Sequence, residues 1–527
     1  MISSISQMSR MARNAVRSQD WKIVVDCANS ILRQDTNNAE GYFLTGLVEK
    51  ASNRPVRAAQ AFEKALELDG SRYDAAIELA NQYSIARRNG EVAKLLTKYE
   101  DKLDNSPIYL DLAGTVYTEI GMPQKAWPLY VKANKLQPKV DLFQANLAAC
   151  GVFLGKIEEA QKIYRALLKR FPNHQRNHYQ LARLSKAKDT FHIEQMQEIL
   201  QASDDTADKN IFMYYALGKE LEDLERWQES YSYYQQGGDA VCSVAKHNVG
   251  NDIALIDKIV EICNADWLKE GATKPNTTRS KKTPIFIVGL PRTGTTLTER
   301  IVSSHSQVES VGETLFLQMI LRRESGVSSV ENMNPEIINS VAKVDPELIA
   351  KGYIDSLAYR LGDEPFFIEK LPFNFLFLGF VAKAWPNARI IHLGRNPIDA
   401  CFSMYKQVFT WAYKFSYSLK DLGQYYVAYD QLRNHWRDVL GDRLIEVEYE
   451  SLASDTETQT RELLEKLGLN FEQSCLDFDK NSLPSATASS VQIREKTHSR
   501  SINKWKNFSK ELQPLKDYLE SAGIKVE

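Results

Sequence analysis

Residues 285–296 read IFIVGLPRTGTT, an apolar run that ends in a turn with two glycines, and an amphipathic segment follows at residues 297–302. This order predicts a buried strand, a loop and the start of a helix. A turn at a helix N-terminus presents backbone N–H groups and the positive end of the helix dipole to an anion. We therefore predict a phosphate-binding loop, with contacts from Arg292, Thr293, Gly294, Thr295 and Thr296.

The loop has the spacing of a P-loop but lacks the lysine of that motif. Thr295 stands where a nucleotide triphosphatase carries the lysine that reaches the β- and γ-phosphates. Arg292, inside the loop, carries a guanidinium that can pair with phosphate or sulfate oxygens in a bidentate way. A P-loop kinase that uses ATP and magnesium stays an alternative, and the missing lysine counts against it.

Three further apolar runs, at residues 366–368, 390–393 and 444–447, alternate with helical segments. Such alternation predicts an α/β domain with a mostly parallel sheet flanked by helices. Ligands of these sheets bind at the carboxyl ends of the strands. Candidate site residues are therefore expected just after each run.

A second candidate phosphate site follows the run that ends at residue 394. Pro397 favours a helix start, so Arg395 is expected at another strand-to-helix junction beside N–H donors. Ser403 lies eight residues after Arg395, about two helical turns along. For this segment alone, a surface arginine and a helix serine would be the simpler interpretation.

The first half of the chain repeats with a period of 34 residues. Small residues mark the period at Ala12, Gly46, Ala80, Gly114, Ala148 and Ala182. Within each unit, apolar spacings of three and four predict two amphipathic helices, so the array is an all-α solenoid. The pattern resembles the tetratricopeptide repeat over residues 5–240, with a last unit that resumes two residues late around Gly218.

A polar, turn-rich stretch at residues 270–278 separates these two styles of sequence. We predict a repeat array at residues 1–245, a helical connector and linker at 246–282, and an α/β domain at 283–527. The repeat surface is expected either to bind a peptide or protein or to support the second domain.

Composition excludes several classes of partner. Lys and Arg number 66 against 68 Asp and Glu, and the net charge of −2 provides no overall field for nucleic acid or an anionic membrane. The six cysteines are scattered without a spacing that suits zinc, which predicts unpaired thiols in a reducing compartment. The N-terminus lacks the apolar stretch of a secretory signal, and no window reaches the length of a membrane span. We expect a cytoplasmic protein.

The segments PRTGTTL, from residue 291, and LGRNPIDACFSMY, from residue 393, together resemble the paired signatures of PAPS-dependent sulfotransferases. The nearest pattern is that of the protein-tyrosine sulfotransferases and of the bacterial sulfotransferases that carry tetratricopeptide repeats. The resemblance covers most of residues 284–505. It implies that PAPS is the donor, that PAP is the product and that no metal is required.

The resemblance also implies catalytic roles. In that family a glutamate 21 residues after the loop arginine is the general base, and Glu313 has that spacing from Arg292. A lysine 25 residues before the second arginine stabilises the departing oxygen, and Lys370 has that spacing from Arg395. Arg292 would stabilise charge on the transferred group. His305 is a second candidate for the base and is less favoured than Glu313.

Further nucleotide contacts are carried over from the same family. Arg395 and Ser403 are expected at the 3′-phosphate. Tyr449 follows a predicted strand and is expected near the adenine. Residues 492–505 resemble the family's donor-covering segment, so Ser490 and Lys504 are carried over as nucleotide contacts.

The sequence leaves three interpretations of the activity open and does not identify the acceptor. A hydroxyl acceptor, such as a peptide tyrosine, fits the first interpretation, in which the repeats help to recruit it. The others are the ATP-dependent kinase and a repeat scaffold with an inactive nucleotide domain. An aromatic stretch at residues 409–417 is expected either to line an acceptor pocket or to pack as an ordinary core helix.

Overall fold

The computed structural model describes residues 4–103, 105–270, 282–329, 333–409, 412–481, 483–485, 487, 490–494 and 499–526. The chain forms two compact units, Met1–Leu154 and Gly155–Glu527. The described part of the first unit is helical throughout, whereas the second combines helices with a parallel sheet. The predicted fold class, a helical repeat array followed by an α/β domain, is confirmed.

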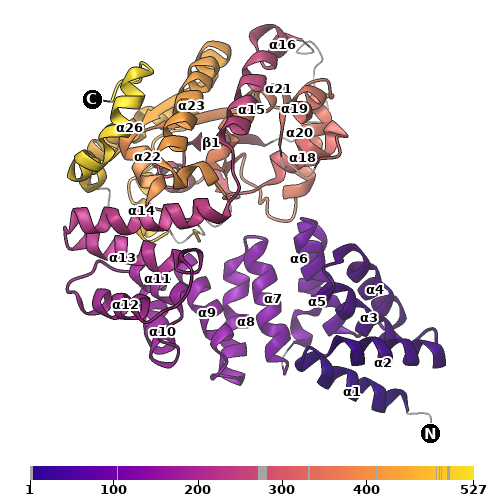
Figure 1. The fold of residues 1–527 in the computed structure, drawn as a ribbon. Coiled ribbons are helices and arrows are strands. Elements are labelled where there is room, and N and C mark those ends of the chain that lie inside the picture. Colours follow the sequence, from indigo (N-terminus) through magenta and orange to yellow (C-terminus); the bar gives the residue numbers. More distant parts are fainter. Residues whose placement is uncertain are drawn as a thin grey trace. The chain divides into compact units, whose positions relative to one another are not determined.

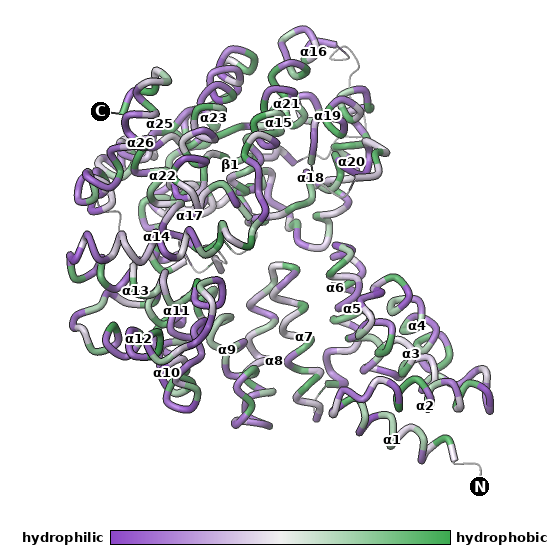
Figure 2. Tube along the Cα trace, viewed as in Figure 1, coloured by the Kyte–Doolittle hydropathy of each residue, from purple (hydrophilic) through white to green (hydrophobic). Residues whose placement is uncertain are grey.

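The first unit is built of successive antiparallel helices. They are α1 (Ile5–Arg17), α2 (Trp21–Gln34), α3 (Ala39–Ala51), α4 (Pro55–Leu68), α5 (Tyr73–Ile85), α6 (Asn89–Tyr99), α7 (Pro107–Glu119), α8 (Pro123–Leu136) and α9 (Asp141–Phe153). Helices α1, α3, α5, α7 and α9 begin 34 residues apart, which confirms the predicted period. Each helix carries both hydrophobic and hydrophilic residues along its length (Figure 2).

The period is set by a small residue that packs under an aromatic ring. A Cβ atom built on Gly46 of α3 would lie 2.4 Å from the ring of Phe62 on α4. Gly114 of α7 stands in the same relation to Tyr130 of α8, at 2.9 Å. The paired helices approach this closely because these positions carry almost no side chain.

The second unit begins with helices of the same kind, α10 (Ile157–Arg170), α11 (Gln175–Arg183), α12 (Phe191–Gln201), α13 (Ile211–Asp223) and α14 (Trp227–Val244). Helix α13 begins 36 residues after α11, so the predicted delay of two residues is present. Gly218 of α13 still lies under Tyr234 of α14, where an added Cβ would be 2.7 Å from the ring.

The sheet has five parallel strands in the order β2-β3-β1-β4-β5. They are β1 (Thr283–Gly289), β2 (Val308–Ser310), β3 (Phe366–Lys370), β4 (Arg389–Gly394) and β5 (Leu444–Glu448). Four of them match the predicted apolar runs. Strand β2 has only three residues and was not expected. The carboxyl ends of all five strands meet at one edge.

Alternate residues of the central strand supply two separate cores. Figure 1 shows strand β1 among the helices of the second unit. Phe286 and Val288 of β1 face a large cluster, whereas Ile285 and Ile287 face a smaller one with α17 (Thr295–Ser303) and α25 (Thr456–Leu467). The large cluster includes residues of α15 (Val249–Ile262), α18 (Phe316–Ser325), α20 (Pro346–Leu357), α21 (Leu378–Ala384), α22 (Pro397–Tyr405), α23 (Leu419–Leu440) and α26 (Ser509–Ser521).

The large cluster also contains residues of α11, α12, α13 and α14. The last helices of repeat type therefore share a core with the sheet, and the compact unit extends back to Gly155. The boundaries expected at residues 245 and 283 stay a prediction. Helix α16 (Ala265–Lys269) follows α15, and the linker expected at 270–278 lies outside the described residues after residue 270.

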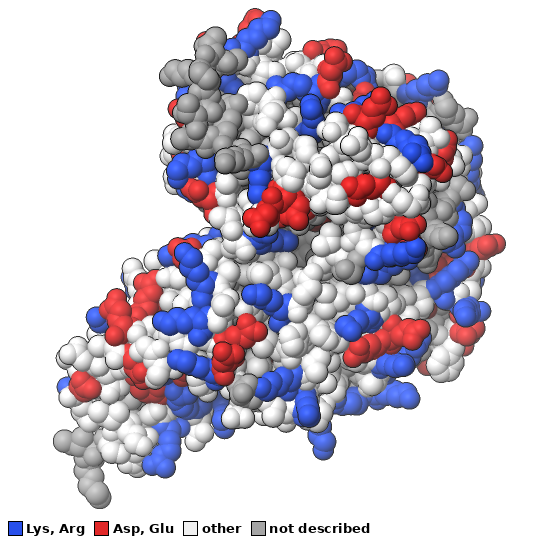
Figure 3. Space-filling model, turned by 180° about the vertical axis from the view of Figure 1, so that it is seen from behind, with Lys and Arg blue, Asp and Glu red and all other residues white. Residues whose placement is uncertain are grey.

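Charged side chains of both signs alternate over the face drawn in Figure 3. Among the described residues, no helix combines the length and the apolar character needed to cross a bilayer. All six cysteines, which lie in described segments, are unpaired.

The Gly46–Phe62 contact gives a stability prediction. Gly46→Ala is expected to lower the free energy of unfolding of the first unit by about 1–3 kcal/mol, because the methyl group would displace the buried ring. Gly90→Ala on α6 is the control, since nothing lies within 4 Å of its added Cβ and alanine favours the helix by up to about 1 kcal/mol. Urea denaturation of both variants measures the difference, and equal midpoints would contradict the packing argument.

Candidate active site

The candidate residues lie where the strands of the sheet end. The phosphate loop follows β1, Lys370 is the last residue of β3, and Arg395 follows β4. Glu313 comes three residues after β2, and Tyr449 directly follows β5. The parallel sheet thus brings together side chains that are separated by up to 157 residues in sequence.

The loop has the backbone that an anion site needs. Gly294 is the N-cap of α17 with φ of 98°, and an added Cβ would lie 2.6 Å from Tyr449. The hydroxyl of Thr293 donates to the Leu290 carbonyl oxygen at 2.7 Å, which closes the turn. Thr295 and Thr296, both buried, form the first turn of α17, so their N–H groups lie at the positive end of the helix.

Arg395 connects the two predicted phosphate sites. Its guanidinium donates to the carbonyl oxygens of Arg292 and Ser501, each at 2.8 Å, and lies 4.8 Å from the centroid of the Tyr449 ring. The Nε atom of Arg395 is buried and has no hydrogen-bond partner among the described residues. A buried donor without an acceptor is costly, and an anion would satisfy it.

Arg292 is held in an unusual conformation beside this group. Its φ of 70° lies in the left-handed region, which non-glycine residues rarely adopt, and the bond from Arg395 holds its carbonyl oxygen. Burial, together with the like charges of Arg395 and Arg183, lowers the pKa of Arg292 to about 10. A bound anion would relieve this repulsion.

Lys370 lies between two carboxylates. Its ammonium group is fully buried and donates to Glu313, and the Glu299 carboxylate on α17 lies 3.6 Å away. Burial opposes the charged form, but Glu313 and Glu299 outweigh it and raise the pKa of Lys370. Lys370 is therefore a fixed positive charge at neutral pH.

The turn that carries Glu313 is anchored to β3. The Lys370 N–H donates to the Gly312 carbonyl oxygen at 3.0 Å, and the Thr314 hydroxyl donates to Glu369 at 2.9 Å. Burial raises the pKa of Glu369 to about 8, so this carboxyl group is protonated at neutral pH. The side chain of Glu313 itself is 40% exposed, which leaves room for a partner other than Lys370.

The remaining predicted contacts, Ser403, Ser490 and Lys504, have different surroundings. Ser403 lies in α22 and is half-buried. Ser490 is buried, and its N–H donates to the carbonyl oxygen of Thr487, whose hydroxyl accepts from Thr296 at 3.4 Å. Lys504 pairs with Glu222 of α13 at 2.5 Å.

The C-terminal segment is attached to the second phosphate site. Asp399, in the first turn of α22, accepts the N–H groups of Asn503 and Trp505 at 2.7 and 3.0 Å. The hydroxyl groups of Tyr449 and Ser501 are 2.5 Å apart. Residues 499–505 therefore run past Arg395, as the expected donor-covering segment would.

Both ring nitrogens of His305 have backbone hydrogen-bond partners. Its Nε2 atom lies 3.0 Å from the Asn470 carbonyl oxygen, and its Nδ1 atom accepts the Gln307 N–H at 3.1 Å. With both ring nitrogens bonded and the residue buried, His305 is placed to stabilise the turn after α17.

The aromatic stretch is not a regular helix. It contains a short 3-10 helix, η4 (Lys414–Tyr417), whose Phe415 and Tyr417 are buried, and its Trp411 lies outside the described residues. Tyr413, half-buried, packs against Phe373, the second residue of the 3-10 helix η3 (Pro372–Phe377), at a centroid distance of 5.1 Å. Burial and the nearby Glu313 both raise the pKa of Tyr413, so this aromatic group lies on the Glu313 side of the site.

Sequence reasoning missed Glu299 and Glu222. Glu299 lies in the amphipathic segment that follows the loop, where a polar residue is ordinary. The one available signal was its spacing of seven residues from Arg292. Glu222 lies in the repeat array, and no local signal connects it to Lys504. Within the described residues, no group of three or more His, Cys, Asp or Glu side chains is arranged to hold a metal ion.

Comparison with known proteins agrees with this arrangement. Residues 284–473 match the family model described as the sulfotransferase family, so the C-terminal half contains a sulfotransferase-family domain. A protein-tyrosine sulfotransferase of Drosophila melanogaster is 24% identical over 233 residues, which cover 42% of this chain and 46% of that protein.

A second relative extends over both halves. A protein of Aquifex aeolicus (strain VF5), described as uncharacterized, is 27% identical over 443 residues, which cover 82% of this chain and 57% of that protein. The chain thus spans about half the length of the curated relatives it matches. Among solved structures, the sulfotransferase domain from the curacin biosynthetic pathway aligns with 47% of this chain and 100% of its own length, at 15% identity and a TM-score of 0.34.

The buried Glu222 gives a pH prediction. Burial opposes its charge, but Lys406 and Lys504 lower its pKa from 4.5 to about 2. Because the folded value is the lower one, its ionisation stabilises the fold fully above pH 4.5 and loses that effect as the pH falls towards 2. Glu222→Gln is expected to cost about 3–5 kcal/mol at pH 7, with a smaller difference from wild type at pH 4.

Denaturant unfolding at both pH values measures the effect. Glu229→Gln is the matched control, because Glu229 forms an exposed pair with Arg226 and should change stability by less than about 1 kcal/mol. Equal losses for the two variants would show that the buried pair contributes no more than a surface pair.

Proposed function

We infer that the C-terminal domain is a PAPS-dependent sulfotransferase that moves a sulfuryl group onto a hydroxyl acceptor. The observation that carries this proposal is the buried, unpartnered Nε of Arg395 beside a phosphate loop that has Thr295 in place of a lysine. A donor with phosphate at both ends of its ribose would use two anion sites, whereas ATP would use one chain of phosphates. The match of residues 284–473 to the sulfotransferase family supports the same class.

The residues present fit the requirements of this chemistry. PAPS would supply a sulfuryl group bonded to a 5′-phosphate oxygen. Glu313 would take the acceptor's hydroxyl proton while the acceptor oxygen bonds to sulfur, and the bond from sulfur to the bridging oxygen breaks. Lys370 and Arg292 would stabilise the negative charge that grows on the departing and sulfuryl oxygens.

The acceptor is proposed from the surroundings of Glu313. Phe373 and Tyr413 place aromatic rings on that side of the site, so an aryl hydroxyl such as a peptide tyrosine would find a stacking partner. The repeat array is proposed to bind a peptide or protein, including the acceptor itself. Six unpaired cysteines favour a reducing compartment, and we propose the cytoplasm.

Donor identity is tested by calorimetric titration with PAP and, separately, with ATP and magnesium. PAP is expected to bind, and Arg395→Ala is expected to weaken it by at least about 10-fold, because a charged hydrogen bond contributes about 1.5–3 kcal/mol. Preference for ATP with magnesium would overturn the proposal in favour of a kinase. Binding of neither nucleotide would favour a scaffold with an inactive domain.

The role of Glu313 is tested by sulfuryl transfer from labelled PAPS to a tyrosine-containing peptide mixture. Glu313→Gln is expected to lower kcat by about 10²–10⁴ while PAP affinity stays near that of wild type. Glu336→Gln is the control, since Glu336 is an exposed residue of α19 (Pro335–Val341). An unchanged kcat in Glu313→Gln would remove it as the base.

A further inference from the structure

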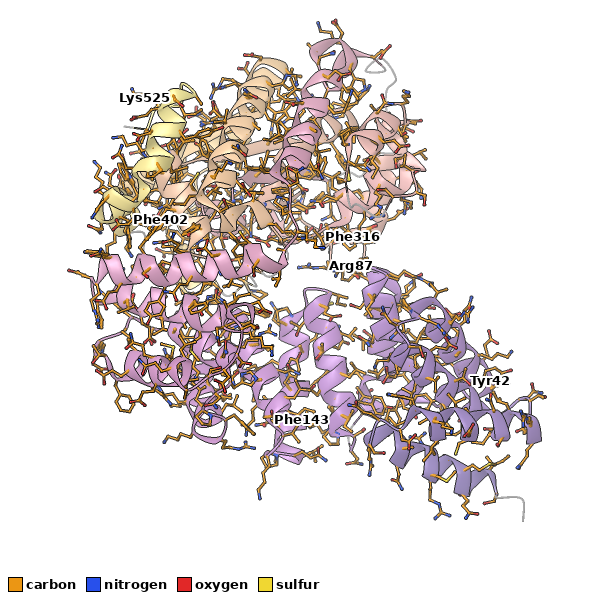
Figure 4. All side chains as sticks on the ribbon, viewed as in Figure 1. Tyr42, Arg87, Phe143, Phe316, Phe402 and Lys525 are labelled. Carbon is orange, nitrogen blue, oxygen red and sulfur yellow. The ribbon has the colours of Figure 1, made fainter. Side chains whose placement is uncertain are left out.

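The helices α13 and α14 are packed directly onto the elements that form the second phosphate site. Trp227 of α14 contacts Phe508 of η10 (Lys504–Phe508) at a centroid distance of 5.5 Å. Tyr231 of α14 stacks on Tyr405 of α22 at 6.3 Å. The ring of Phe402, which is labelled in Figure 4, lies 4.6 Å from that of Phe508. These helices precede the segment that matches the sulfotransferase family.

A single buried carboxylate joins α13 to two lysines of the C-terminal domain. Glu222 lies 2.8 Å from the ammonium of Lys406 and 2.5 Å from that of Lys504, and it accepts the Tyr234 hydroxyl at 3.1 Å. Only 8% of the Glu222 side chain and 15% of the Lys406 side chain are exposed, whereas 38% of the Lys504 side chain is exposed. One carboxylate cannot neutralise two ammonium groups, and a positive charge remains.

Lys406 lies at the end of the helix that carries Ser403. It is the C-cap residue of α22 and follows Ser403 by three residues, about one helical turn. Its ammonium lies 4.6 Å from the centroid of Phe402. Burial, and the like charges of Lys504 and Arg395, lower the pKa of Lys406 in spite of Glu222, so these cations act on one another across a short distance.

Helix α11 reaches the same region through Tyr179. The Gln407 side chain donates to the Tyr179 hydroxyl at 2.9 Å, directly after Lys406. The guanidinium of Arg183, one turn further along α11, lies over the Tyr179 ring at 5.3 Å. Arg183 is among the charges that lower the pKa of Arg292, so it lies on the phosphate-loop side of this contact.

We propose that the donor site extends onto the helices of repeat type, with Arg183 of α11 and Lys406 at the C-cap of α22 as further ligands of the donor's phosphates and Glu222 of α13 as the positioning residue for Lys406 and Lys504. This inference rests on the proposed function. The charges agree with it. Five cations, Arg183, Arg292, Arg395, Lys406 and Lys504, outnumber the carboxylates Glu222 and Asp399 that contact the same elements, and a nucleotide with two phosphates carries about four negative charges.

The two ligands are assigned to different phosphates, which makes the test specific. Lys406 shares Glu222 with Lys504 and follows Ser403 by three residues, so it is expected at the 3′ end. Arg183, whose guanidinium lies over the Tyr179 ring and whose charge acts on Arg292, is expected at the 5′ end. We would titrate the full chain with PAP and with adenosine 5′-monophosphate, which lacks the 3′-phosphate. Arg183→Gln should weaken both nucleotides by about 10- to 100-fold, and Lys406→Gln should weaken PAP by as much but leave the monophosphate unchanged.

The matched control is Arg176→Gln, an exposed arginine on the same helix as Arg183, which should bind both nucleotides like wild type. Thermal unfolding checks that each variant is folded. If Lys406→Gln does not fold, the result for Arg183→Gln decides the test, because Arg183 is only half-buried and its replacement should not prevent folding. PAP binding by Arg183→Gln within twofold of wild type would overturn the inference while the sulfotransferase assignment stands. Failure of wild type to bind PAP would instead overturn the assignment.

Discussion

The parallel register of the sheet is the constraint on which the site depends. With the strand order β2-β3-β1-β4-β5, each strand delivers its following residue to the same edge, and the central strand delivers the phosphate loop. Lys370 and Arg395 then lie on either side of that loop because β3 and β4 are the neighbours of β1. A slip of one residue in either neighbour would turn Lys370 or Arg395 to the opposite face of the sheet.

Charge is distributed unevenly along this edge. On the β3 side, the single ammonium of Lys370 meets two carboxylates, whereas on the β4 side two lysines, Lys406 and Lys504, share one carboxylate, Glu222. The first arrangement suits a step that moves a proton and stabilises a leaving oxygen. The second suits a polyanion that must be held without being altered. Under the proposed function, binding and chemistry would occupy adjacent parts of one edge, with Arg292 between them.

Much of this could be predicted because it is local or is spaced regularly along the chain. The 34-residue period, the strand-loop-helix at 285–302 and four of the five strands follow from patterns within a few tens of residues. The roles of Glu313 and Lys370 were expected only by resemblance, and their ion pair was not predicted. The pair of Glu222 with Lys406 joins residues 184 positions apart, and nothing near either residue signals it, because the contact arises from the packing of two elements against each other. Strand β2 was missed because three residues are too few to show alternation.

Glu222 is part of α13, a helix of repeat type, and it forms ion pairs with Lys406 and Lys504 near Arg395. Any ligand that moves α13 changes the electrostatic potential felt by an anion at Arg395, and an anion at Arg395 changes the conformation that α13 prefers. Thermodynamic reciprocity requires these two effects to be equal in free energy. A peptide on the helices of the second unit and a nucleotide at the sheet edge would thus obey a single coupling constant, and occupancy at one place would report on occupancy at the other.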